Sequence, residues 1–192
     1  VEDGRVYMYM TNDTQGYAPN PATGVSPQID YGKINQITVI SSDDLVNWTD
    51  HGSPMGLATF AWAEADAWAG QVVERDGKFF FYVPVKQRGG GMVIGVGVSD
   101  SPTGPFRDAI GRPLVGNGEI DPSVMIDDDG QAYLYWGNPN LWYVKLNRDM
   151  VSYSGSPTRI PLTTAGFGNR PGNVANRPTL YEEGPWVYKR NG

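Results

Sequence analysis

The sequence predicts an all-β fold, a β-propeller, and three observations support this prediction. Gly and Pro number 25 and 15 among the 192 residues, which is typical of a chain that turns often. No segment shows the periodicity of a convincing amphipathic helix. A unit of about four short strands recurs along the chain, as it does in propeller blades, whereas a sandwich would not repeat a whole four-strand unit.

The recurring unit is built around an Asp-Gly or Asn-Gly pair that is followed by a β-prone, mostly Tyr-rich segment. These pairs begin at Asp3, Asp76, Asp129 and Asn191, so the steps between them are 73, 53 and 62 residues. Asp-Gly and Asn-Gly supply the positive φ angles of a tight hairpin turn. Each copy is therefore expected to begin with a hairpin, and the spacing of the copies sets the blade boundaries.

The repeat predicts one domain over residues 1–192, a partial propeller whose blades have approximate limits. The expected blades are 1–60 (partial), 61–115, 116–165 and 175–192 (partial). The first copy lacks the strand before its turn, and the fourth copy lacks everything after its turn. We therefore expect an incomplete set of blades.

One position recurs eight residues before each turn, where the first strand of a blade is expected to begin. From the third and fourth turns this position is Asp121 and Glu183, and from the second turn it is Trp68. The first strand of a propeller blade lies nearest the central axis, so equivalent positions ring one mouth. The repeat therefore predicts that two carboxylic acids converge there. The alternative is that the Asp-Pro and Glu-Gly-Pro segments are ordinary polar turns.

Converging carboxylates are what glycoside hydrolysis requires. One group protonates the leaving oxygen, while another activates water or attacks the anomeric carbon. Like charges held close together also raise the pKa of one partner, which helps to keep an acid protonated near neutral pH. The pair formed by Asp121 and Glu183 is therefore a candidate catalytic pair.

At these residues the chain resembles glycoside hydrolase family 43. Segment 120–137 resembles the third-blade motif of that family, and segment 183–190 resembles its general-acid motif. The resemblance implies a five-bladed β-propeller with an inverting mechanism. It also implies that Glu183 is the general acid and that Asp121 orients this acid and tunes its pKa.

The resemblance further implies a general-base Asp in the first blade. The eight-residue step from the first turn falls before the first residue of the chain, so this base is expected to be absent from it. Asp13 and Asp30 lie nearby in the sequence, but neither has the required register.

The second blade indicates the sugar. Its segment Trp68-Ala69-Gly70-Gln71 stands where many family members have Trp-Ala-Pro-Glu. That variant resembles the branch of the family that trims arabinose from arabinoxylan. The resemblance implies exo-acting removal of α-L-arabinofuranosyl groups from arabinoxylan or arabinan. A β-xylosidase or an endo-arabinanase is the alternative within the hydrolases, and a non-catalytic carbohydrate-binding propeller fragment is the alternative from another class.

Hairpin geometry nominates further substrate contacts. The second strand of a blade returns to the mouth, so the residues at its end in the third blade, Trp136 and Asn138, are expected near the site. Trp68 occupies in the second blade the same position, eight residues before the turn, that the two carboxylates occupy in the third and fourth blades. Sugars stack on aromatic faces, so Trp68 and Trp136 are candidates to form the floor of a sugar-binding subsite. The alternative is that they belong to the core, because a β-rich core uses the same residues.

Charge and composition exclude several partners. The net charge of −6 gives no electrostatic reason for binding nucleic acid or an anionic membrane. No apolar run approaches the roughly 20 residues of a membrane span, and the absence of cysteine excludes disulfides and thiol chemistry. The expected partner is a plant cell-wall polysaccharide or oligosaccharide, and the expected location is secreted or periplasmic rather than cytoplasmic.

No cofactor is expected to be required. Segment 127–130 resembles a calcium loop faintly, but the remaining ligands and the closing Glu are absent, so a charged hairpin turn is predicted there instead. Some members of the family hold a structural calcium ion in the central channel, and its ligands are not assigned to any residue of this chain. The sequence therefore predicts no metal ligand.

Overall fold

The computed structural model describes residues 2–13, 22–24, 33–172 and 177–190. These residues form the strands β1 (Val6–Asp13), β2 (Ile34–Ser42), β3 (Thr49–Asp50), β4 (Met55–Gly56), β5 (Ala63–Ala67), β6 (Gln71–Arg75), β7 (Lys78–Gln87), β8 (Met92–Ser99), β9 (Arg107–Asp108), β10 (Ser123–Ile126), β11 (Ala132–Trp136), β12 (Leu141–Leu146) and β13 (Tyr153–Ile160). They also form two single-turn helices, η2 (Leu57–Thr59) and α1 (Thr164–Phe167). No helix in the described part of the chain is long and apolar enough to cross a membrane.

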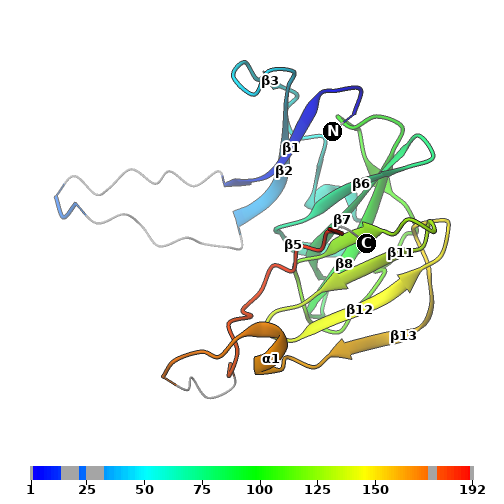
Figure 1. Cartoon of the computed structure of the whole chain (residues 1–192). Coiled ribbons are helices and arrows are strands. Elements are labelled where there is room, and N and C mark those ends of the chain that lie inside the picture. Colours follow the sequence, from blue (N-terminus) through cyan, green and yellow to red (C-terminus); the bar gives the residue numbers. More distant parts are fainter. Residues whose placement is uncertain (1, 14–21, 25–32, 173–176, 191–192) are drawn as a thin grey trace.

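The strands form three antiparallel sheets that follow one another in chain order (Figure 1). The first has the order β1-β2-β3 with β4 beside β2, and the second has the order β5-β7-β8-β9 with β6 beside β7. The third is a simple meander, β10-β11-β12-β13, in which each strand pairs with the next. The three sheets lie within the first three blade ranges that the repeat predicts.

Two of the predicted hairpin turns have the expected conformation. Asp3 and Gly4 have φ angles of 48° and 79°, and Asp76 and Gly77 have φ angles of 53° and 75°. Two consecutive residues with positive φ define the turn whose twist matches that of the flanking strands. The Asp76-Gly77 pair therefore places the β6–β7 hairpin of the second sheet, whereas the Asp3-Gly4 pair forms a turn before β1 that is closed by the bridge between Glu2 and Arg5.

The third turn is one residue longer than the sequence predicts. The amide of Asp127 donates to the carbonyl of Gln131 at 2.9 Å, and the amide of Gly130 donates to the carbonyl of Asp127 at 2.8 Å. Only Gly130 has a positive φ, of 81°. The result is a three-residue hairpin loop, which needs one left-handed residue instead of two. The fourth predicted turn, Asn191-Gly192, and Asp30 lie outside the described residues.

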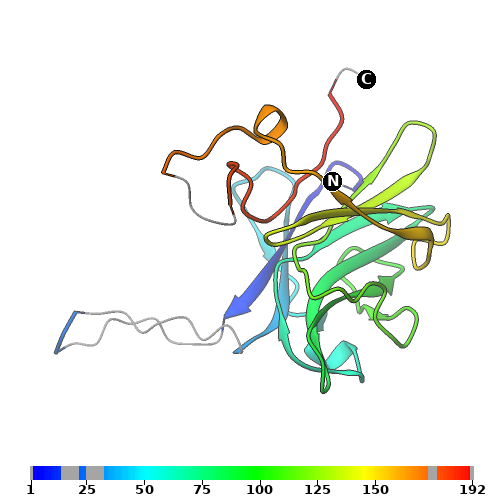
Figure 2. The same ribbon diagram turned by 90° about the horizontal axis from the view of Figure 1, so that it is seen from below.

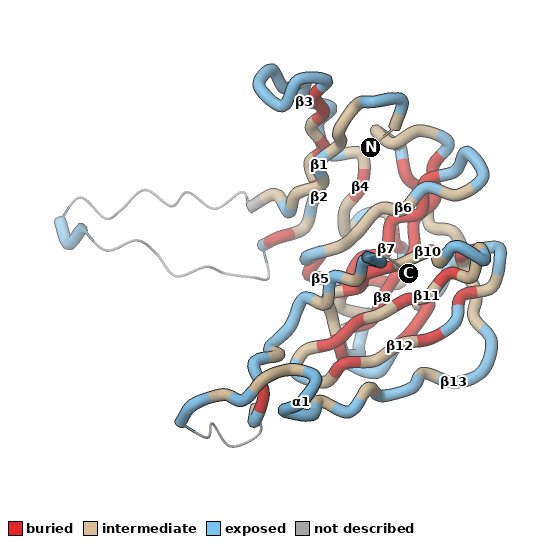
Figure 3. The backbone as a smooth tube through the Cα atoms, viewed as in Figure 1, coloured by how far each residue is buried: buried red, intermediate tan, exposed pale blue. Residues whose placement is uncertain are grey.

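The middle sheet is buried on both faces, and the sequence of β7 reflects this. Phe79, Phe81 and Val83 pack with residues of the first sheet, whereas Phe80 and Tyr82 pack with the third sheet. Successive side chains of a strand point to opposite faces, so a strand covered on both sides is apolar at every position. Figure 3 shows the buried residues concentrated in these central strands. Each buried Phe contributes about 1.5–3 kcal/mol of transfer free energy.

Polar contacts join the second and third sheets. The hydroxyl of Tyr82 donates to the carbonyl of Met150 at 2.6 Å, and Arg75 donates to the carbonyl of Gly130 at 2.9 Å. Burial raises the pKa of Tyr82 well above its ordinary value, so this residue remains a neutral donor. The relative placement of the two sheets, and therefore of the loops at their ends, is fixed by directional bonds as well as by packing.

The chain after α1 differs from the prediction of a fourth first strand. Residues 177–190 contain no strand, and Figure 2 shows this segment lying to one side of the sheets. It is tied to the third sheet at its end, where Lys189 pairs with Asp127 at 2.7 Å and with Asp128 at 2.6 Å. Strands pair through backbone amides and carbonyls, whereas the contacts of this segment with the third sheet involve side chains: the amides of Gly184 and Val187 donate to the side chains of Asp121 and Ser123.

Candidate active site

Asp121 and Glu183 line one cavity of about 600 Å³, together with Trp68 and Asn138. Four of the five residues that the sequence nominates therefore come together. The remaining residues of the lining come from the ends of β1 and β2, from the loops before β6 and β10, and from the segment after Glu183. They are Thr11, Ile34, Ala69, Gly70, Ile120, Pro122, Gly184, Pro185 and Trp186.

Asp121 lies two residues before β10 in a left-handed conformation, with a φ angle of 61°. Asp tolerates this conformation better than most residues do, because its short side chain bonds locally. Its carboxylate accepts a hydrogen bond from the amide of Gly184 at 3.2 Å. That bond joins the third-blade acid to the residue directly after Glu183, so the two sequence motifs meet at this point.

The pKa of Asp121 is raised above its ordinary value. Burial of the half-buried carboxyl is the main cause, and the neighbouring charge of Glu183 adds to it, while the hydrogen bond from Gly184 opposes it. A carboxyl group that lies near another one and is partly removed from water is the arrangement with which glycosidases separate the roles of two acids. The two carboxyls therefore interact, and Asp121 is the one whose pKa is raised.

Glu183 is exposed to the cavity and is held by one side chain. Its Oε2 accepts a hydrogen bond from Nδ2 of Asn138 at 2.5 Å. The Oδ1 of Asn138 in turn accepts from Arg177 at 3.1 Å. The sequence predicts Asn138 as a substrate contact, and the structure adds that it touches the predicted acid directly.

Tyr181 contacts the loop that carries Asn138. Its hydroxyl donates to the carbonyl of Gly137 at 2.8 Å, and its ring packs edge-to-face against Phe167 with 5.8 Å between the centroids. Burial raises the pKa of Tyr181, and the charges of the nearby carboxylates Asp121, Glu119 and Glu183 raise it further. The hydroxyl is therefore a neutral donor at neutral pH.

Two tryptophans border the cavity. Trp68 is half-buried, whereas 69% of Trp186 is exposed. Exposed aromatic faces are the surfaces on which sugar rings stack. The sequence analysis does not predict Trp186 as a substrate contact. Its position three residues after Glu183, within the second motif, could have indicated that it lies near the site.

Trp136 is not part of the cavity, and the prediction that it floors a sugar subsite is wrong. Its side chain is 0% exposed and belongs to the core between the second and third sheets. Its ring nitrogen donates to Oδ1 of Asn117 at 3.0 Å. The alternation of β11 places Ala132, Leu134 and Trp136 on the same inward face. Asn138 reaches the cavity because the chain turns sharply at Gly137, beyond the end of the strand.

Gly137 makes this turn possible. Its φ angle is 145°, and a Cβ atom at this position would lie 1.5 Å from the carbonyl oxygen of Asn140. Its amide donates to the carbonyl of Ile120 at 2.7 Å, next to Asp121. No side chain fits here, so the position of Asn138 depends on this glycine.

Replacing Gly137 by Ala is expected to displace the Asn138 loop and to reduce activity strongly. The backbone strain alone is of order 1–3 kcal/mol, and the contact with Asn140 adds to it. A matched control is Gly155→Ala, because Gly155 also has a positive φ, of 80°, but has open space around it. Thermal unfolding and kcat of both variants check this prediction. Equal effects in the two variants would contradict this prediction, because they would show that Gly137 is needed only for its positive φ angle and not for its close approach to Asn140.

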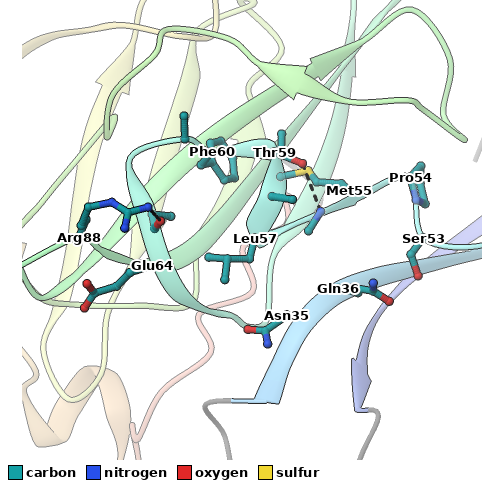
Figure 4. Close-up of a pocket in the computed structure, with 14 residues that line it drawn as sticks. Asn35, Gln36, Ser53, Pro54, Met55, Leu57, Thr59, Phe60, Glu64 and Arg88 are labelled. Atoms are coloured by element: carbon teal, nitrogen blue, oxygen red, sulfur yellow. Dashed lines mark hydrogen bonds between the residues drawn. The ribbon is translucent and has the colours of Figure 1, made fainter.

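A second cavity, of about 770 Å³, lies outside this site (Figure 4). It is bordered by Phe60, Glu64 and Arg88 and contains neither Asp121 nor Glu183. Glu64 is paired with Lys86 at 3.1 Å. Among the described residues that line this cavity, no second acid accompanies Glu64, so they do not form a carboxylate pair like that of the candidate site.

The candidate calcium loop is a hairpin turn, as the sequence predicts. Asp127 and Asp128 share the ammonium group of Lys189, which offsets one of their two negative charges. Within the described residues, no group of three or more acidic or histidine side chains is arranged to hold a metal ion.

Comparison with known proteins identifies the family. The model of Glycosyl hydrolases family 43 matches residues 1–192. The chain is 38% identical over 194 residues to an arabinoxylan arabinofuranohydrolase of Bacillus subtilis, covering 82% of this chain and 37% of that protein. It is 27% identical over 223 residues to a xylosidase/arabinosidase of Bacteroides ovatus, covering 100% of this chain and 66% of that protein.

A solved structure agrees with this assignment. An α-L-arabinofuranosidase from Clostridium thermocellum superposes with a TM-score of 0.73 at 35% identity, covering 100% of this chain and 59% of that one. The chain thus spans from about a third to just under two thirds of the length of these relatives. The structural neighbours are five-bladed β-propellers, so the three sheets are blades of an incomplete propeller. The chain belongs to glycosyl hydrolases family 43.

Proposed function

We propose that the protein is an inverting, exo-acting glycosidase that removes α-L-arabinofuranosyl groups from arabinoxylan or arabinan. The observation that carries this proposal is the junction of the two motifs, where Asp121 accepts from the amide of Gly184 while Asn138 holds Glu183 in the same cavity. Glu183 is the general acid, and Asp121 orients it and tunes its pKa.

In this mechanism Glu183 protonates the oxygen of the leaving group as the glycosidic bond breaks. Water attacks the anomeric carbon from the opposite face of the sugar and loses its proton to a general base. We assign that base to no residue in the part of the chain that the structure describes. Trp68 and Trp186 border the cavity and offer faces against which a sugar ring can stack.

The choice of arabinose rests on the relatives. The Bacillus subtilis protein is an arabinoxylan arabinofuranohydrolase and the Clostridium thermocellum protein is an α-L-arabinofuranosidase. A second candidate function is β-xylosidase, because the Bacteroides ovatus relative is a xylosidase/arabinosidase and a relative from Xylanibacter ruminicola is a β-xylosidase. An endo-arabinanase, or a binding module without catalysis, is a more distant alternative.

The test is to incubate the full-length protein with arabinoxylan, arabinan and xylo-oligosaccharides and to identify the sugars that are released. We expect free arabinose as the first product, and we expect NMR to show that its anomeric configuration is inverted. Release of xylose instead of arabinose would favour the second candidate. Short oligosaccharides as first products would indicate endo action, and binding without hydrolysis would indicate the non-catalytic alternative.

A further inference from the structure

We propose that Glu119 is a positioning residue for the catalytic acid, acting through Asn138. Glu119 holds the loop 137–140 in place, and Asn138 in that loop holds the carboxylate of Glu183. This inference rests on the proposed role of Glu183 and extends it to a residue that belongs to neither acid position of the two motifs.

Glu119 is a buried carboxylate, only 9% exposed, and both of its oxygens are engaged by the same loop. Oε2 accepts from the backbone amide of Asn138 at 2.6 Å, and Oε1 accepts from Nδ2 of Asn140 at 2.7 Å. A buried carboxylate is costly unless it accepts hydrogen bonds of this kind. Its two bonds link the chain before β10 to the loop between β11 and β12.

Asn138 is thereby fixed at three points. Its backbone amide is held by Glu119, its Oδ1 faces Arg177 at 3.1 Å, and its Nδ2 faces Glu183 at 2.5 Å. Arginine only donates hydrogen bonds, so the oxygen of the Asn138 amide must face Arg177. The nitrogen is therefore directed at Glu183, where it can only donate. The orientation of this amide is set by its partners.

The short segment 119–121 contains Asp121 and also contacts the residues that hold Glu183 in place. Glu119 holds Asn138 through its carboxylate, the carbonyl of Ile120 accepts from Gly137 at 2.7 Å, and Asp121 accepts from Gly184 at 3.2 Å. The first two contacts place the loop that touches Glu183, and the third places the residue that follows Glu183. A displacement of Glu119 is thus transmitted to Glu183 by a path separate from Asp121.

A general acid works only when its proton lies within hydrogen-bond reach of the leaving oxygen. A misplacement of about 1 Å can lower the rate roughly 100-fold. In Glu119→Gln, one of the two acceptor oxygens becomes an NH₂ group, which would face a donor, either the amide of Asn138 or Nδ2 of Asn140. The loop must shift, and Asn138 moves away from Glu183.

The experiment measures how the loss of activity depends on the leaving group. The full-length protein and its Glu119→Gln, Asn138→Ala and Glu183→Gln variants are assayed on two aryl glycosides of the released sugar, one with a phenyl and one with a 2,4-dinitrophenyl leaving group. The dinitrophenolate departs without a proton, so only the phenyl glycoside needs the acid. We expect Glu119→Gln and Asn138→Ala to lower kcat on the phenyl glycoside roughly 10- to 100-fold, with little loss on the dinitrophenyl glycoside.

Three comparisons make the result decisive. Glu119→Asp keeps both acceptor oxygens and is expected to recover part of the loss. Asp100→Asn removes an exposed carboxylate that is paired with Lys78 at 2.6 Å, and it is expected to act like the wild type on both substrates. Asn138→Ala leaves Glu119 and the loop backbone intact, so it tests the contact with Glu183 even if Glu119→Gln fails to fold.

The outcomes separate this inference from the proposed function. If Glu183→Gln itself shows no dependence on the leaving group, the assignment of the acid fails, and the positioning role fails with it. If Glu183→Gln shows the dependence but Asn138→Ala loses activity equally on both substrates, or on neither, the positioning role is overturned and the acid stands. A leaving-group dependence shared by the Glu119, Asn138 and Glu183 variants supports the inference.

Discussion

Glu183→Gln is expected to lower kcat on arabinoxylan roughly 100- to 10,000-fold, which is the range for removal of a general acid. The amide has the same size as the acid, and its oxygen can still accept from Nδ2 of Asn138, so the cavity should keep its shape. What is lost is the proton for the leaving oxygen. Initial rates of sugar release by the full-length protein check this prediction.

The neighbouring residue supplies the control for that experiment. Glu182 is exposed and paired with Arg170 at 2.6 Å, and it does not border the cavity. Glu182→Gln makes the same chemical change one residue away and should leave kcat close to that of the wild type. Unchanged activity in Glu183→Gln, or an equal loss in both variants, would show that Glu183 is not the acid.

Asp121→Asn is expected to have the second largest effect on activity, again of roughly 100-fold or more. The substitution removes the charge beside Glu183 while the side-chain oxygen can still accept from Gly184, so the loss comes from electrostatics more than from geometry. Measurement of kcat for the purified full-length variant, with circular dichroism to confirm folding, tests this.

For the same variant we also predict how its stability differs from that of the wild type at acidic and at neutral pH. Burial raises the pKa of Asp121 in the folded protein, so folding favours the protonated form. The stabilising contribution of this carboxyl is present below its ordinary pKa of 3.8 and is lost as the pH rises through the folded value. Asparagine is always neutral, so the Tm of Asp121→Asn should match that of the wild type at acidic pH and exceed it at neutral pH. A lower Tm for the variant at neutral pH would contradict this account.

Much of the fold could be predicted from local sequence. The pairs Asp3-Gly4 and Asp76-Gly77 form tight turns because few other residues adopt two consecutive positive φ angles. The three sheets fall within the blade ranges that these turns and the third Asp-Gly pair mark. At the third turn, the loop length depended on how β10 and β11 pair, and the Asp-Gly pair alone does not specify that register.

The candidate site was predictable in part. The spacing of residues along the chain was enough to find the two carboxylates, but not to tell on which face of its strand a side chain lies. Asp121 and Glu183 could be found because one register recurs in successive blades. Trp136 was placed wrongly because the end of a strand indicates proximity to the mouth but not the direction of the side chain. The alternation of β11 was visible in the sequence, and it points Trp136 into the core with Leu134.

The sequence by itself determined the all-β class, the repeat and the family, and it singled out the two carboxylates that line one cavity, because each of these depends on neighbours in the chain or on a fixed spacing. Only the tertiary structure decided how the acids are held. Asn138 and Glu183 are 45 positions apart in the sequence and meet at 2.5 Å, and Glu119 reaches Asn138 across 19 positions. Such contacts depend on how the third sheet packs against the C-terminal segment, and no local pattern encodes that packing. The two acids can thus be read from the sequence, but the buried carboxylate proposed to hold one of them in place cannot.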